Sequence, residues 1–503
     1  MKKALCIITA LLFISLCACA PLPAREVIVI DTPAPQATAH PAGSVPTEPP
    51  ASTDEATQTP TEAPSPAPTA VPTEEPTPVP TEAPRTPVDA ADAAALYSYR
   101  AVDIPYVDRP TLVSQNETTP SRYHPDPDGI YRMNEPRGQG EAVLYFTGDL
   151  MCQTRQQLAG ESFKGGYDFE ESFDYVRELF GKADLVIGNL EGSFSDQSPY
   201  MCEQNRVEDS YNLNAPSTFV QAVRNAGFDM VIMSNNHVLD SDVRGIYDTL
   251  DCVDRYELMH TGLYRSGEEE RTFIAEVNGI RIGILNYSTF FNRKEWHLND
   301  LGKDTLLNIY TKERLERDMA RVRERGAEYV IVCMHWGIEY ADSPSVTRYL
   351  PASIRGAEDR GIELPITLDF QLKWAQEIAD AGADYIVGSH THSIQPYDVI
   401  KSADGRNVPV IYSMGNFVSH QKKAGTNDTL ILRVTLTKEG GKVVLKNDGY
   451  IPTKIFEVFM GKDYVVIPVV KPYCGDLESK SFSEAYYRIV KAVGWKISVL
   501  GWL

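Results

Sequence analysis

The chain has 503 residues and a formal net charge of −21 at pH 7. This acidic balance excludes nucleic-acid binding through a broad basic face, because such a face needs clustered Lys and Arg. It also means that an anionic substrate would need bound cations to be attracted to the protein.

The first residues predict a lipoprotein signal peptide over residues 1–19. Lys2 and Lys3 precede an apolar run at residues 4–16, which is too short for a comfortable membrane span. The run ends in Leu-Cys-Ala-Cys, which resembles a bacterial lipobox. We expect cleavage before Cys19, lipidation of that cysteine and a lipid anchor at the extracellular face of the bacterial cell membrane. An ordinary secreted protein that is cleaved nearby is the alternative.

The next segment predicts a disordered Pro-rich linker over residues 20–95. Residues 31–90 contain no aromatic side chain and hold sixteen of the 34 prolines. Such a composition cannot bury a core and should stay extended. The linker would hold a folded head away from the membrane; a protease-tolerant spacer with no particular target is the alternative.

From residue 141 onward, short apolar runs alternate with stretches of helical period. Strands are predicted at 143–147, 185–187, 230–233, 280–286, 329–334 and 384–387, and helices at 169–180, 217–225, 243–256, 312–325 and 368–381. This alternation predicts an α/β fold with a largely parallel sheet that is covered on both faces. The strands after residue 395 favour a second stacked sheet.

The head is predicted to span residues 96–470, and a helical tail follows over residues 471–503. Residues 343–366 break the rhythm of strands and helices and contain three prolines. We interpret them as a loop insertion beside the site, and a surface loop is favoured over a lid.

Six short polar motifs lie along the head, and predicted strands lead into five of them. They are Gly148-Asp149, Gly188-Asn189-Leu190-Glu191, Ser234-Asn235-Asn236-His237, His335-Trp336, Gly388-Ser389-His390-Thr391-His392 and Ser413-Met414-Gly415-Asn416. The carboxyl ends of neighbouring strands in an α/β protein converge on one crevice. Two carboxylates, one Asn amide and four imidazoles would meet there, which indicates a metal site.

Each motif also has an ordinary structural explanation. Gly-Asp makes turns, and the Asn-His motif is compatible with a helix N-cap followed by a core histidine. Three histidines at the ends of two successive buried strands favour ligation more strongly. Two carboxylates on adjacent strands need a positive charge between them, or one will protonate. A set of nitrogen and oxygen ligands without thiolate suits one or two Mn, Fe or Zn ions.

Taken in order, the motifs resemble the CapA family of bacterial capsule-synthesis proteins, which is linked to poly-gamma-glutamate. The fourth motif continues as His335-Trp336-Gly337-Ile338-Glu339-Tyr340, and the last runs from Tyr412 to Phe417. The resemblance covers residues 141–437. That family in turn resembles the calcineurin-like metallophosphoesterases, which implies a four-layer α/β/β/α fold with a two-metal site.

The resemblance also implies roles for individual side chains. The implied metal ligands are Asp149, Glu191, Asn236, His335, His390 and His392. Glu191 would stand in the place of a bridging carboxylate, and His237 in that of the His that protonates a leaving oxygen. The expected substrate-binding residues are Asn189, Arg155 and Asn416, of which Asn416 could instead orient a ligating His.

Two departures from the pattern matter. Met151 stands where metallophosphoesterases usually carry His, so one metal subsite has a ligand fewer. Arg155 comes about one residue later than the family's usual Arg.

Two functions of different classes follow. The first is a metal-dependent hydrolase at the cell surface that acts in synthesis, transfer or hydrolytic trimming of an anionic polymer such as poly-gamma-glutamate. One or two cations would lower the pKa of a bound water, and His237 would donate a proton. The second is a non-catalytic polymer-binding or export factor that partners a membrane synthase, which the absence of a ligand at Met151 favours.

Overall fold

The computed structural model describes residues 106–109, 116–162, 166–204, 212–351 and 363–503. These residues belong to the unit Val88–Leu503. The predicted signal peptide with Cys19 and the predicted Pro-rich linker lie outside the described residues. Within the described part, no helix combines the length and the apolar character that crossing a membrane requires.

A first sheet has the strand order β18-β17-β16-β3-β4-β5-β6, with β15 paired to β3 and β19 paired to β17. Its strands are β3 (Glu141–Leu150), β4 (Leu185–Leu190), β5 (Met230–Ile232), β6 (Met259–Thr261), β15 (Asn416–Val418), β16 (Asp428–Glu439), β17 (Lys442–Phe459), β18 (Lys462–Pro468) and β19 (Ser498–Val499). Strands β3 to β6 run parallel. Strands β16 to β18 join them antiparallel as a long meander.

A second sheet has the strand order β1-β2-β7-β8-β9-β12-β14-β13. Its strands are β1 (Tyr123–Pro125), β2 (Tyr131–Met133), β7 (Phe273–Val277), β8 (Ile280–Ser288), β9 (Tyr329–His335), β12 (Tyr385–Ser389), β13 (Tyr397–Lys401) and β14 (Asn407–Ile411). Its central strands β8, β9, β12 and β14 are parallel. Continuous apolar runs such as β9 are typical of parallel strands that are buried on both faces.

The two sheets share one core because successive side chains of a strand point to opposite faces. Leu144 and Phe146 of β3 pack in the same cluster as Ile331 and Cys333 of β9. Tyr145, between the two β3 residues, packs in a separate cluster on the other face of the first sheet. The sheets are therefore stacked face to face.

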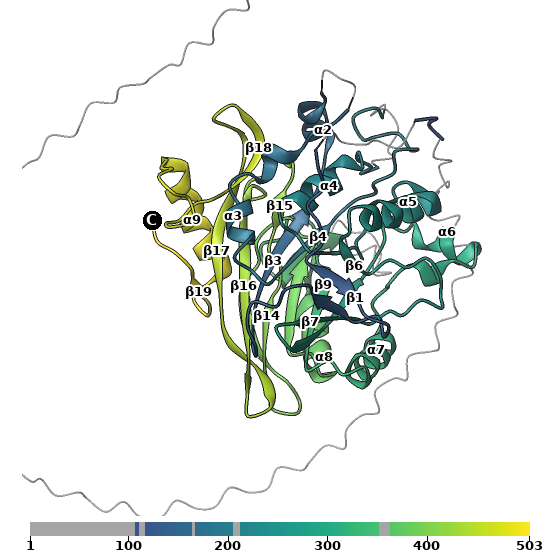
Figure 1. Cartoon of the computed structure of the whole chain (residues 1–503), viewed down its shortest axis with the longest axis vertical. Coiled ribbons are helices and arrows are strands. Elements are labelled where there is room, and N and C mark those ends of the chain that lie inside the picture. The colour runs from purple at the N-terminus through teal and green to yellow at the C-terminus, as the bar shows by residue number, and fades with distance from the viewer. Residues whose placement is uncertain (1–105, 110–115, 163–165, 205–211, 352–362) are drawn as a thin grey trace, which may run out of the picture. The chain divides into compact units, whose positions relative to one another are not determined.

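Helices cover the outer face of each sheet (Figure 1). The first sheet is covered by α3 (Arg177–Phe180), α4 (Thr218–Asn225) and α5 (Asp242–Arg255). The second is covered by α7 (Lys312–Glu324) and α8 (Phe370–Asp380). Shorter elements are α2 (Thr154–Gly160), η1 (Glu170–Phe173), α6 (Glu295–Asp300) and η2 (Asp304–Leu306). The predicted four-layer α/β/β/α architecture is confirmed.

The tail contains α9 (Lys480–Val493), which packs on β16 and β17 and is drawn in yellow beside β17 in Figure 1. Its apolar face buries Phe482, Ala485 and Ile489. On the polar side, Arg488 donates two hydrogen bonds of 2.6 and 2.8 Å to Asp428 of β16. This helix therefore extends the core over the antiparallel part of the first sheet.

The segment at residues 343–366 differs from the predicted loop. Strands β10 (Val346–Pro351) and β11 (Glu363–Leu368) pair antiparallel as a separate two-stranded sheet. The prolines misled the prediction, because a proline is tolerated in a strand that lies at an edge. In a ribbon of two strands, both strands are edges.

Candidate metal centre

Five polar side chains lie at the strand ends of the first sheet, all at one edge. Asp149 is the penultimate residue of β3, and the parallel register places Asn189 of β4 beside it. Glu191 follows the last residue of β4, and Asn236 and His237 lie in the loop after β5. All five side chains are buried.

Strand ends of the second sheet deliver three imidazoles to the same place. β9 ends at His335, whose register partner is Ser389, the last residue of β12. His390 and His392 follow directly, both in the left-handed region with φ of 92° and 59°. A side chain adopts this backbone only at a cost of about 1–3 kcal/mol, and such strain is concentrated at functional sites.

Glu191 lies at the centre of the cluster. Asn189 Nδ2 donates to Asp149 Oδ1 at 2.8 Å and, more weakly, to Glu191 Oε2 at 3.3 Å. Glu191 Oε1 has no hydrogen-bond partner, although it is buried. Three imidazole Nε2 atoms surround this oxygen at 3.9, 3.9 and 4.0 Å, from His335, His392 and His237. These distances are too long for hydrogen bonds and leave a space ringed by electron-pair donors.

Two groups of donor atoms in this space could each hold a metal ion. One consists of Glu191, His335 and His390, and the other of Asp149, Glu191 and His392, with the atoms of each group within 4.8 Å of one another. The groups share Glu191, and Asn236 Oδ1 lies 2.7 Å from His335 Nε2. His390 Nδ1 is a second buried atom without a partner. Buried nitrogen and oxygen atoms that have a lone pair but no hydrogen-bond partner are suited to bind a divalent cation.

The tautomer of His392 also suits ligation. Its Nδ1–H faces two oxygens, Asp149 Oδ2 at 3.0 Å and Asn416 Oδ1 at 2.9 Å. A proton held there leaves the lone pair of Nε2 directed at the centre. Asn416 in turn donates through Nδ2 to Thr426 O at 3.1 Å, which fixes the direction of its amide.

Burial controls the charge of the cluster. Burial and the neighbouring Asp149 raise the pKa of Glu191 well above its ordinary value. Burial and the neighbouring imidazoles lower the pKa of His335 and of His390 well below the ordinary value. His335 and His390 are therefore neutral, which is the form that binds metal, and the clustered carboxylates need a positive charge to ionise together.

His237 belongs to a separate buried chain of charges. Its Nδ1–H donates to Asp240 Oδ2 at 2.7 Å, and Lys294 Nζ donates to Asp240 Oδ1 at 2.6 Å. The backbone N–H of Leu213 donates to Asp240 as well. Burial would raise the pKa of Asp240, but Lys294 and His237 outweigh it and hold that pKa below its ordinary value. Asp240 therefore fixes the ring of His237 with Nε2 toward Glu191.

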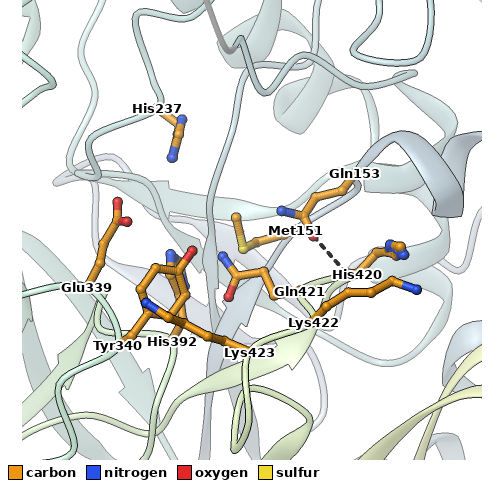
Figure 2. A pocket seen from close by; sticks show the side chains of 10 residues that line it. All are labelled: Met151, Gln153, His237, Glu339, Tyr340, His392, His420, Gln421, Lys422 and Lys423. Carbon is orange, nitrogen blue, oxygen red and sulfur yellow. Dashed lines mark hydrogen bonds between the residues drawn. The ribbon is translucent and has the colours of Figure 1, made fainter. Parts of the chain in front are cut away.

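A cavity of about 550 Å³ opens beside the cluster (Figure 2). Its wall is formed by Met151, Gln153, His237, Glu339, Tyr340, His392, His420, Gln421, Lys422 and Lys423. His237 and His392 are the cluster residues that reach this wall, so a molecule in the cavity would contact both.

Residues 143–354 and 365–421 match the family described as "Bacterial capsule synthesis protein PGA_cap", which is more than half of the chain. The chain belongs to this family. The matched segments include all six motifs, and the resemblance to capsule-synthesis proteins that the motifs predict is confirmed.

Curated relatives agree with this assignment. The chain is 26% identical over 317 residues to the capsule biosynthesis protein CapA of Bacillus anthracis, covering 61% of this chain and 67% of the relative. It is also 26% identical over 297 residues to the PGA biosynthesis protein CapA of Bacillus subtilis (strain 168), covering 59% and 68%.

Two solved structures have weak similarity to this chain. The calcineurin-like phosphoesterase YfkN of Bacillus subtilis has a TM-score of 0.32 at 13% identity, covering 70% of this chain and 97% of that one. The sulfate thiohydrolase SoxB of Thermus thermophilus has a TM-score of 0.37 at 12% identity, covering 71% and 61%.

In this family member the three predicted substrate-binding residues have different surroundings. Asn189 is buried and donates to the Asp149 carboxylate, and Asn416 accepts from His392. Neither lines the cavity, so both orient the candidate ligands. Arg155 is exposed on the first turn of α2, outside the cavity wall, where its charge is close to Tyr464. The structure does not bring Arg155 to the site, because α2 turns its side chain toward solvent.

Met151 lies two residues beyond Asp149, at the position where the metallophosphoesterase pattern predicts a ligand. Its side chain packs against Met201 and Leu213 and forms part of the cavity wall. An apolar thioether therefore takes the place of an imidazole here.

Sequence reasoning missed Asp240 and the basic part of the cavity wall. The spacing of three residues between His237 and Asp240 was a usable signal, because residues three apart in a helical turn face each other. Lys422 and Lys423 had a weaker signal, namely adjacent lysines in an acidic chain shortly after the last motif.

Proposed function

We propose that this capsule-synthesis family protein is a divalent-metal hydrolase that acts on an anionic surface polymer, with poly-gamma-glutamate as its substrate. The observation that carries the proposal is the buried, unpartnered Glu191 Oε1, which three imidazole Nε2 atoms surround. The printed name of the Bacillus subtilis relative, a PGA biosynthesis protein, supports the choice of polymer.

A divalent ion bound by the cluster would supply Lewis acidity and lower the pKa of a bound water. His237 reaches both the cluster and the cavity, and Asp240 holds its Nδ1–H. Its Nε2 is therefore the atom that would carry a proton to a leaving group. Asn189 and Asn416 hold Asp149 and His392 in orientation, so that the donor atoms keep their directions during a reaction.

The location of the protein at the cell surface is part of the same proposal. Cys19 would be lipidated and would anchor the protein at the extracellular face of the bacterial cell membrane. A polymer that leaves a membrane synthase would then meet the site outside the cell, and the Pro-rich linker over residues 20–95 would give the head its reach.

A second candidate is a non-catalytic polymer-binding or export factor. Met151 favours it, since an apolar side chain packed against Met201 and Leu213 cannot replace a ligand. In this function, the metal would hold carboxylates of the polymer, and His237 would be dispensable.

The experiment compares wild-type protein with His390→Ala/His392→Ala and with His237→Ala. We expect one or two equivalents of Mn, Fe or Zn in the wild type and in His237→Ala, and none in the double variant. We expect wild-type protein to shorten poly-gamma-glutamate, and His237→Ala to bind the polymer but turn it over at least 100-fold more slowly. Metal analysis and size-exclusion chromatography of the polymer supply the readouts.

Equal turnover by wild type and His237→Ala would remove the assigned proton donor. Polymer binding without turnover in the wild type, under each of the three metals, would favour the binding factor over the hydrolase. Wild-type protein that takes up no metal would overturn both.

A further inference from the structure

The residues 420–423 form a basic and donor-rich part of the cavity wall in an otherwise acidic chain. The chain carries a net charge of −21, yet the wall presents Lys422 and Lys423 against one carboxylate, that of Glu339. The family match ends at residue 421, so it assigns these two lysines no role. The wall can therefore be interpreted only from its geometry.

The amide of Gln421 is oriented by a chain of hydrogen bonds that starts at the metal cluster. His392 donates to Asn416 Oδ1, and Asn416 Nδ2 donates to the carbonyl of Thr426 and to Gln421 Oε1 at 2.9 Å. The carbonyl of Thr426 can only accept, so the Asn416 amide must turn its Nδ2 toward it. The same Nδ2 donates to Gln421 Oε1, and this fixes the direction of the Gln421 amide as well. Gln421 Nε2 has no acceptor among the described residues, and Gln421 lines the cavity.

Gln153, the residue that precedes α2, is oriented in the same way. The backbone N–H of His420 donates to Gln153 Oε1 at 2.7 Å, which is the dashed line in Figure 2. A backbone N–H can only donate, so Oε1 must face it, and Nε2 of Gln153 is turned away from His420. Within the part of the chain that is described, this NH₂ group also has no acceptor. Two amide donors thus face the cavity.

Lys423 adds a full positive charge that is held in position. Its Nζ lies 3.9 Å from the ring centroid of Tyr340, a cation–π contact. Tyr340 is itself held in the left-handed region by a 2.7 Å hydrogen bond from its N–H to Thr391 O, and its ring lies 5.7 Å from that of His392. Lys423 has no ion pair with a described residue, whereas its neighbour Lys422 lies 3.6 Å from Glu457.

We propose that Lys423, Gln421 and Gln153 form a carboxylate-binding subsite beside the metal cluster. It would hold the free carboxylate of one polymer repeat while the neighbouring repeat lies at the metal centre. This inference rests on the proposed function. One ammonium and two neutral amide donors match the single charge and the planar oxygens of a carboxylate. A phosphodiester also carries a single charge, but its two free oxygens belong to a tetrahedral group and not to a planar one. The subsite is therefore assigned to the carboxylates of linked acidic amino acids, and the test compares them with a phosphate-linked polymer.

The test compares Lys423→Gln with Lys422→Gln in the full-length protein loaded with Mn²⁺. Both variants remove one charge from the cavity wall, but only Lys423 belongs to the subsite. We expect Lys423→Gln to raise KM for poly-gamma-glutamate about 10-fold or more with little change in kcat, since a hydrogen bond to a charged group is lost. Lys422→Gln should change KM less than about twofold.

Three further arms separate the alternatives. Gln421→Glu turns a donor into a carboxylate and should raise KM at least as much as Lys423→Gln. For poly-gamma-glutamate whose carboxylates are converted to amides, KM should be the same for the wild type and Lys423→Gln. A glycerol-phosphate polymer should be a poor substrate of the wild type and of every variant.

Equal KM values for the wild type and Lys423→Gln would overturn the subsite and leave the proposed function standing. A KM effect confined to the glycerol-phosphate polymer would overturn the assignment to carboxylate. Wild-type protein that neither binds nor cleaves poly-gamma-glutamate would overturn the subsite together with the proposed function. Unchanged Mn²⁺ content in the variants shows that the cluster has remained intact.

Discussion

Asp240 is a fully buried carboxylate that is held by three donors: His237, Lys294 and the N–H of Leu213. Asp240→Asn would turn an NH₂ group toward one of these donors and leave Lys294 without its ion pair. We expect the free energy of unfolding at pH 7 to fall by about 3 kcal/mol, as when one partner of a buried ion pair is removed. We also expect kcat to fall with unchanged metal content, because the ring of His237 loses its fixed orientation.

The pH dependence of this effect has a definite sign. The pKa of Asp240 is lower in the folded protein than its ordinary value of about 4. The stabilisation is thus present above pH 4 and is lost as the pH falls through the folded-state value. Urea unfolding should show the difference between wild type and variant at pH 7 and a smaller difference below pH 4. Asp242→Asn, at a partly exposed carboxylate, is the control and should change stability by less than about 0.5 kcal/mol.

At the residue scale, the sequence indicated which polar residues lie together, because each of the candidate ligands lies at or shortly after the end of a strand. Asp149, Glu191 and His335 each end an apolar run, and parallel strands bring such ends together. The position of Lys423 beside the site could not be predicted, because the backbone N–H of His420 in the same loop bonds to Gln153, 267 positions away. Arg155 was predicted from the family resemblance, and its place after the Gly-Asp motif does not show which way the side chain points from the helix.

At the scale of elements, β3 and β15 approach closely at Gly148. A Cβ atom at this residue would lie 1.8 Å from the carbonyl oxygen of Gly415, which also accepts from Asp149 N at 3.1 Å. We expect Gly148→Ala to separate the two strands, to lower the free energy of unfolding by about 3 kcal/mol and to weaken metal binding through Asp149. Thermal unfolding and metal analysis check this.

Gly138→Ala is the matched control for that variant. A Cβ atom at Gly138 would meet nothing within 4 Å, and the residue is not in the left-handed region. It should therefore behave as the wild type. A Gly148→Ala protein that is as stable as Gly138→Ala and retains its metal would show that the strands can move apart without cost.

The periodicity of the sequence predicted the parallel strands and their covering helices, because both faces of each sheet are buried. The periodicity did not predict β10 and β11. These two strands pair only with each other, from Val346 opposite Leu368 to Pro351 opposite Glu363. The short ribbon has no sheet on either side, so no extended apolar pattern marks it. The prolines in this segment therefore favoured a loop in the prediction.

At the scale of the whole molecule, the candidate ligands come from both sheets. Asp149, Glu191 and Asn236 follow strands of the first sheet, and His335, His390 and His392 follow strands of the second. A metal ion bound by them would link the two β layers and would bind the folded state alone. At a free metal concentration of 1,000 Kd, this linkage stabilises the protein by about 4 kcal/mol.

We therefore expect removal of the metal with a chelator to lower the melting temperature by about 5 °C or more. Differential scanning calorimetry with and without added Mn²⁺ measures the shift. His390→Ala/His392→Ala should melt at one temperature whether or not Mn²⁺ is present. An equal shift in that variant would mean that the ion acts elsewhere on the protein.

The loop at residues 420–423 lies between β15 and β16, outside the strand ends that carry the candidate ligands. With the proposed carboxylate-binding subsite in this loop, substitutions there would alter which chemical group is accepted, while the atoms that would hold the ion keep their places. Such a separation would let the preferred polymer change through substitutions in one short surface segment without disturbing the candidate ligands. Exchanging that segment between homologues is thus a direct route to redesigning polymer preference.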